Sequence, residues 1–211
     1  MGEVIQETEI SGLRLERNLY TSSPDRQFYS VVASDGPGIS DVVTHSPTFS
    51  YTQYGIHVAQ VDRLTFFGNP DKKVTGHFVD CREGSPTLHR KVTLELRPDP
   101  TVLVHIDRGV AHTFDGLENI TTRDEPVWYL SADNPHYNIA NDVVNIDRSE
   151  PLENFPVVRV NEYPIPRQAY EFMLKVQHVT LMEMRRYPSR FQMDIDGEKR
   201  YVSLIPKGKA A

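Results

Sequence analysis

The sequence predicts an all-β fold, a β-sandwich or barrel, with a short appendage at the C-terminal end. Short apolar or alternating runs fill the first 150 residues, and Pro, Gly, Asp or Asn separate them about every eight to twelve positions. The chain has 211 residues, which suits one domain with a sizeable core. After about residue 150 the pattern changes to a proline-rich stretch and then to a helical period.

The expected strands follow one another along the first part of the chain. Residues 90–96, RKVTLEL, show the pattern best, because Val92, Leu94 and Leu96 alternate with polar residues, as in a strand with one buried face. Gly-Asn-Pro-Asp within residues 66–73 has the composition of a tight connection between strands. The other expected strands lie at residues 27–34, 54–61, 63–67, 73–81, 101–107 and 126–130.

The C-terminal part is expected to form an appendage. Residues 149–166 are rich in proline and should run extended over the surface. Residues 167–187 lie between Pro166 and Pro188 and carry apolar side chains at helical spacing, namely Ala169, Phe172, Met173, Val176 and Val179. A hairpin over residues 191–205 should turn at Asp196–Gly197. We therefore divide the chain into a domain over residues 1–160 and an extension over residues 161–211.

Composition narrows the choice of partners. The net charge is -6, which argues against general nucleic-acid binding because phosphates bind to basic surfaces. No apolar run is long enough to cross a membrane, and residues 1–10 lack the apolar core of a secretory signal. The single cysteine, Cys81, allows no disulfide within the chain, as is typical of a reducing compartment. We expect a cytoplasmic protein that acts on a small molecule.

Three stretches concentrate the side chains that can do chemistry. They are YGIHVAQVDRL at residues 54–64, VDCREGSPTLHRKVTLEL at residues 79–96, and residues 105–130, which begin HIDRGVAHTF. His57 and His112 each lie in or beside an apolar strand-like run. Each is either a core histidine or a ring that faces a pocket.

Together these stretches resemble the dTDP-4-dehydrorhamnose 3,5-epimerase family of the cupin superfamily. Residues 79–96 are similar to its Val-Asp-Leu-Arg and Ser-Pro-Thr strand pair, residues 105–114 to its Ile-Pro-Pro-Gly-Phe-Ala-His-Gly-Phe segment, and residues 54–60 to its Arg-Gly-Leu-His-Tyr-Gln segment. The resemblance covers residues 25–150. It implies a cupin double-stranded β-helix (jelly-roll) and a homodimer.

The resemblance also implies an activity, the epimerisation of a nucleotide-linked 4-keto-deoxysugar for surface-polysaccharide or natural-product synthesis. Such a reaction needs a base, a group that holds the enolate oxygen, and an acid. His57 matches the family's base and Tyr129 its acid. His112 and Arg63 match the groups near the enolate oxygen, with arginine in place of the family's lysine.

Four further residues are expected to bind the substrate: Arg26, Tyr54, Gln60 and Arg82. Tyr54 stands where the family has an arginine, and Arg82 could equally be a structural ion-pair partner. The family orients its base with an aspartate from a late segment that this chain lacks. The sequence offers Asp142, Asp147 and Glu162 for that role and selects none of them.

Other uses of the same residues stay open. His57, Gln60 and His112 would make a weak metal site, because two imidazoles and one amide are a poor set of ligands for a metal ion. We expect no metal and no cofactor. The pocket could instead belong to a cupin-fold isomerase or cyclase of a non-nucleotide small molecule, or to a non-catalytic small-molecule-binding cupin.

Overall fold

A computed structural model describes residues 3–25, 27–31, 40–131, 136–138, 143–166 and 190–205. These residues are almost entirely in strands and loops, with one short 3-10 helix, η1 (Leu152–Asn154). The strands are β1 (Val4–Glu7), β2 (Leu13–Arg17), β3 (Tyr20–Ser22), β4 (Tyr29–Val31), β5 (Asp41–Thr44), β6 (Gln53–His57), β7 (Gln60–Phe67), β8 (Val74–Asp80), β9 (Lys91–Leu96), β10 (Val102–Ile106), β11 (Val110–Asp115), β12 (Thr121–Asp124), β13 (Val127–Leu130), β14 (His136–Asn138), β15 (Val143–Asp147), β16 (Tyr163–Pro164), β17 (Arg190–Ile195) and β18 (Glu198–Ile205).

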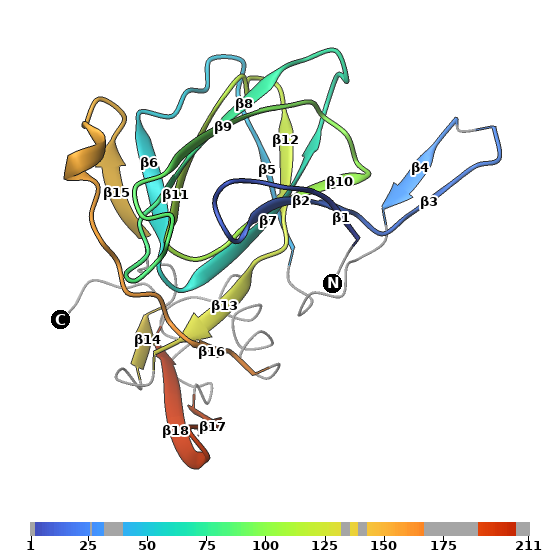
Figure 1. Cartoon of the computed structure of the whole chain (residues 1–211). Coiled ribbons are helices and arrows are strands. Elements are labelled where there is room, and N and C mark those ends of the chain that lie inside the picture. The colour runs from blue at the N-terminus through green and yellow to red at the C-terminus, as the bar shows by residue number, and fades with distance from the viewer. Residues whose placement is uncertain are drawn as a thin grey trace.

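Two antiparallel sheets curve around a common interior (Figure 1). In the described part of the chain, one sheet has the order β1-β2-β10-β7-β12-β5, and β13 pairs with β7 and β16. The other sheet has the order β15-β6-β11-β8-β9. Neighbours such as β7 and β10, or β6 and β11, are far apart in the sequence. This topology confirms the prediction of an all-β jelly-roll.

The main core lies between the two sheets. Its buried side chains include Phe66 from one sheet and Phe78 and Phe114 from the other. Phe114 meets both of the other rings edge-on, at 5.4 and 5.7 Å between centroids. Burying an aromatic side chain of this size contributes about 1.5–3 kcal/mol, so this cluster holds the two sheets together.

A second apolar cluster covers the outer face of the five-stranded sheet. Tyr54, Cys81 and Ala111 of the sheet pack with Phe155 and Val158 from the proline-rich segment. This segment therefore lies over the sheet, and Val158 pairs through its backbone with Cys81. Burial raises the pKa of the Cys81 thiol to about 12.

The predicted C-terminal hairpin is confirmed as β17 and β18. Asp196 and Gly197 at its turn have φ of 55° and 79°, which is the left-handed backbone of a type I′ turn. β18 also pairs in parallel with β14, and the Tyr163 hydroxyl donates to Asp196. The helix expected at residues 167–187 lies outside the described residues, and the boundary at residue 160 stays a prediction. No helix in the described part of the chain could cross a membrane.

Candidate active site

A cavity of about 470 Å³ lies between the two sheets. From β7, alternate residues line it: Gln60, Asp62, Leu64 and Phe66. They share one face because successive side chains of a strand point to opposite sides. From the facing sheet come His57 of β6 and His112 of β11.

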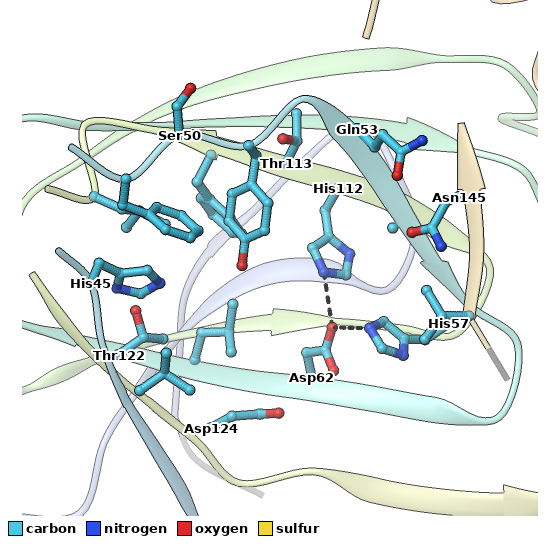
Figure 2. Close-up of a pocket in the computed structure, with 18 of the residues that line it drawn as sticks. His45, Ser50, Gln53, His57, Asp62, His112, Thr113, Thr122, Asp124 and Asn145 are labelled. Atoms are coloured by element: carbon cyan, nitrogen blue, oxygen red, sulfur yellow. Dashed lines mark ion pairs between the residues drawn. The ribbon is translucent and has the colours of Figure 1, made fainter. Parts of the chain in front are cut away.

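His57, Asp62 and His112 converge on one point of this cavity (Figure 2). Asp62 Oδ2 lies 3.1 Å from His112 Nε2 and 3.8 Å from His57 Nε2. The two imidazole rings are nearly parallel, with centroids 5.6 Å apart and an angle of 16° between their planes. Asp62 is buried, so its charge is balanced by these two rings and not by water.

Both ring nitrogens of His112 face oxygens that accept hydrogen bonds. Its Nδ1 lies 3.2 Å from the carbonyl oxygen of Val110. Its Nε2 faces the carboxylate of Asp62 at 3.1 Å. The two contacts suit an imidazole that donates from both nitrogens, which is the positively charged form.

Gln60 links Asp62 to a second carboxyl group, that of Asp124. The indole Nε1 of Trp128 donates to Gln60 Oε1 at 2.8 Å. Because an indole nitrogen only donates, this contact defines the orientation of the amide. The Gln60 amide nitrogen then donates to Asp62 Oδ1 at 2.6 Å and to Asp124 Oδ2 at 3.3 Å.

The two carboxyl groups differ in acidity. Burial raises the pKa of Asp62, but the charge that His57 carries when protonated and the hydrogen bonds from His112 and Gln60 outweigh it and give a pKa of about 2. Burial and the negative charge of Asp62 raise the pKa of Asp124 well above its usual range. Asp124 thus keeps its proton to a much higher pH than Asp62. Such a divergence is typical of carboxyl pairs with different tasks.

Much of the remaining cavity lining is apolar and aromatic. It includes Phe49, Tyr51, Phe66, Phe114 and Leu117, with His45 beside Phe49. Phe49 packs edge-on against Tyr51 at 4.8 Å between centroids. A ligand with an apolar part could bury that part here and present its polar end to the His57–Asp62–His112 cluster.

Three of the expected site residues, His57, His112 and Gln60, line the cavity. Arg63 lies on β7 next to Asp62, so its side chain is directed to the opposite face of the strand, beside His105 of β10. Tyr54 lies on the outer face of β6, where its ring packs edge-on against Phe155. Strand alternation therefore separates Arg63 and Tyr54 from the cavity.

The remaining expected residues also lie elsewhere. The guanidinium of Arg108 stacks on the Tyr129 ring at 3.7 Å, and Tyr129 is not among the residues that line the cavity. Arg82 binds both carboxylate oxygens of Asp80 at 2.8 Å and donates to the backbone of Ser11, which makes it a structural ion-pair partner. Arg26 lies outside the described residues.

The carboxylate beside His57 is Asp62, which is none of the three candidates expected from the sequence. Asp147 accepts hydrogen bonds within its own turn from Ser149, and Glu162 pairs with Arg159 at the surface. Asp142 lies outside the described residues. The sequence does contain one signal that points to Asp62. Gln60 is an expected site residue, and Asp62 follows it by two positions, so a strand through both places their side chains on the same face.

The same three residues could hold a divalent metal ion. His57, Asp62 and His112 each offer one ligand atom, and these atoms lie within 4.8 Å of one another. Two imidazoles and a carboxylate are ligands that zinc or iron(II) accepts, and they form a stronger set than His57, Gln60 and His112. The Val110 carbonyl at His112 Nδ1 resembles the support that metal-binding histidines receive.

No protein-family model and no curated protein matches the sequence. Solved structures do. The rmlC epimerase of Mycobacterium tuberculosis is 18% identical over 86% of this chain and 96% of that one, with a TM-score of 0.49. The dTDP-4-dehydrorhamnose 3,5-epimerase of Bacillus anthracis is 17% identical over 77% and 92%, and the dTDP-6-deoxy-D-glucose-3,5-epimerase of Legionella pneumophila is 16% identical over 78% and 88%, each with a TM-score of 0.49. These likenesses are distant, so the reaction has to be judged from the site itself.

Proposed function

We propose that the protein is an isomerase that moves a proton at a carbon beside a ketone, and in particular an epimerase of a nucleotide-linked 4-keto-deoxysugar. The observation that carries this proposal is the His57–Asp62–His112 cluster on the wall of a cavity large enough for a small molecule. It combines a group that can take a proton with a neighbouring positive charge, as enolate chemistry requires.

In this mechanism His57 is the base. Its Nε2 takes the proton from the carbon, and the electron pair of the C–H bond moves into the enolate. The positive charge of His112 stabilises the enolate oxygen. The imidazolium formed at His57 lies 3.8 Å from Asp62 Oδ2, so the carboxylate stabilises it in the same step.

The nucleotide-linked ketosugar is the substrate that the sequence resemblance implies, with a role in surface-polysaccharide or natural-product sugar synthesis. The test is hydrogen exchange in buffered D₂O with dTDP-4-keto-6-deoxyglucose, followed by NMR. We expect deuterium at C3 or C5, and loss of this exchange in His57→Asn. The surface variant Asp147→Asn is the matched control and should exchange like the parent. No exchange by the parent protein would refute the proposal.

The same assay decides whether the cluster works with a metal ion. With EDTA present, exchange continues if the imidazoles act by themselves. It stops if His57, Asp62 and His112 hold a cation that the reaction needs, and added Zn²⁺ should then restore it.

A second candidate is an isomerase or cyclase of a small molecule that carries no nucleotide. The apolar and aromatic part of the cavity lining favours this candidate. So do the side chains that can carry a charge near neutral pH among the described lining residues, which are two aspartates and histidines and include no arginine or lysine. A diphosphate is ordinarily bound by arginine or lysine. The two candidates differ in a thermal-shift measurement with dTDP, which stabilises the protein only under the first. A non-catalytic binding protein would show no exchange with any ketone.

A further inference from the structure

We infer that Asp124 is the acid of the proposed reaction, the group that returns a proton to the carbon from the side opposite His57. This inference rests on the proposed function. The sequence resemblance assigns the acid to Tyr129, but that ring stacks under Arg108 outside the cavity lining. Asp124 lines the cavity beside Asp62 (Figure 2).

Asp124 and His57 stand on opposite walls. His57 ends β6 in the five-stranded sheet, and Asp124 ends β12 in the sheet that faces it. A planar enolate between the two sheets would have one face toward each residue. Inversion at a carbon requires this arrangement, because the proton leaves from one face and returns to the other.

Hydrogen bonds hold the Asp124 carboxyl in place. Its Oδ1 accepts the backbone N–H of Arg63 at 3.0 Å, and its Oδ2 accepts from the Gln60 amide at 3.3 Å. Trp128 in turn holds Gln60. We place the acidic proton on Oδ2, because Oδ1 already accepts the shorter, backbone hydrogen bond.

The surrounding charges keep that proton on Asp124. Burial and the negative charges of Asp62 and Asp41 raise the pKa of Asp124, whereas the Arg63 backbone N–H and the charge of a protonated His57 lower it. Burial and the charge of Asp62 prevail, since two carboxylates that share one amide donor resist ionising together. The pair therefore offers one ionised and one protonated carboxyl group on the same cavity wall.

The proton balance of the cycle is closed. His57 Nε2 gains the proton of the C–H bond, and the enolate carbon takes the proton of Asp124 Oδ2 as its electron pair returns from the oxygen. The product leaves with its hydrogen on the inverted face. His57 is then protonated and Asp124 ionised, and one proton passed through solvent from His57 to Asp124 resets the site.

The experiment separates proton removal from inversion. In D₂O with dTDP-4-keto-6-deoxyglucose, we expect Asp124→Asn to form the inverted product at least about 10²-fold more slowly than the parent. Deuterium should still enter the recovered substrate with its configuration retained, because His57 is intact. His57→Asn should lose both signals, and Asp147→Asn neither. A parent-like rate of inversion in Asp124→Asn overturns the inference, whereas no exchange by the parent protein overturns the proposed function instead.

A measurement without substrate tests the proton itself. Near neutral pH, the infrared spectrum should contain the C=O stretching band of a protonated carboxyl group. This band should be missing from Asp124→Asn and present in Asp147→Asn, with thermal unfolding used to confirm that both variants are folded. If the parent and Asp124→Asn spectra do not differ in this band, Asp124 does not hold the proton and the inference is wrong.

Discussion

Asp62 and Asp80 are both buried aspartates on central strands, and each has a pKa of about 2, yet their surroundings differ. Asp80 accepts two hydrogen bonds from the Arg82 guanidinium, one from the Arg82 backbone N–H, and one each from the hydroxyls of Ser85 and Thr87. Arginine and hydroxyl donors do not lose their protons near neutral pH. Asp80 is also not among the residues that line the cavity.

Asp62 has partners of another kind. Two of them are imidazoles, which exchange protons in the physiological range, and all of them lie at the cavity. A depressed carboxyl pKa therefore does not by itself distinguish a structural ion pair from a reactive site. The distinction comes from partners that can titrate and from a cavity that a ligand can enter.

The largest expected effect is on activity, from Asp62→Asn. The amide keeps the size of the side chain but cannot balance an imidazolium at His57, so the rate of proton removal should fall about 10²- to 10⁴-fold. Deuterium exchange into the ketosugar measures it. Stability should fall as well, because the native state lowers the pKa of Asp62 to about 2 and so favours its ionised form, and the exchange rate is therefore compared per folded molecule. An unchanged rate of exchange per folded molecule, with only stability reduced, would assign Asp62 to the same structural class as Asp80.

Asp80→Asn should lower the stability of the protein and leave its activity unchanged. The substitution leaves the charge of Arg82 in a largely buried site with only Asp107 Oδ2, at 3.7 Å, as a carboxylate partner, and breaking such a pair costs about 3–5 kcal/mol of unfolding free energy. Urea denaturation measures this cost, with Asp147→Asn as the control. The rate of exchange per folded molecule should be unchanged, so a specific loss of activity would show that Asp80 also serves the site.

The pH dependence of stability should reflect Asp80. Its pKa is lowered from 3.8 to about 2 by fixed donors that outweigh burial, so folding stabilises the ionised form. The stabilisation is complete above about pH 4 and is lost as the pH falls toward 2. Its size is about 2 kcal/mol. The difference between parent and Asp80→Asn unfolding free energies should shrink over this interval, and a constant difference would show that ionisation of Asp80 is not its source.

The sequence predicted the architecture well because strand periodicity and turn residues are local signals. Within residues 90–96, Lys91–Leu96 form β9 with its alternating burial, and Asp196–Gly197 forms the expected turn. The resemblance is clearest over residues 76–114. Within that range residues 79–96 contribute the Asp80–Arg82 ion pair and no cavity wall, whereas His112 lines the cavity. A strong local motif can therefore mark a structural requirement of the fold.

The sequence missed Asp62 because the strand boundary was misplaced. Two strands were expected, at residues 54–61 and 63–67, which left Asp62 in a break between them. The structure instead ends β6 at His57 and begins β7 at Gln60, so Asp62 lies inside a continuous strand. Its side chain then faces inward and that of Arg63 outward. The expectation for Arg63 had a different source, the match to the family's lysine, and the same alternation directs its side chain away from the cavity.

The smallest expected effect comes from Tyr129→Phe. The substitution removes only the hydroxyl and keeps the ring on which the Arg108 guanidinium stacks. Because this ring does not line the cavity, the rate of inversion should stay within about twofold of the parent. The measurement is most informative when Asp124→Asn is measured alongside it. Tyr129 is the acid that the resemblance implies, and Asp124 is the acid that we infer from the cavity. A loss of inversion in Tyr129→Phe, with exchange retained, would mean that Tyr129 reaches the substrate, and the acid would then be the tyrosine.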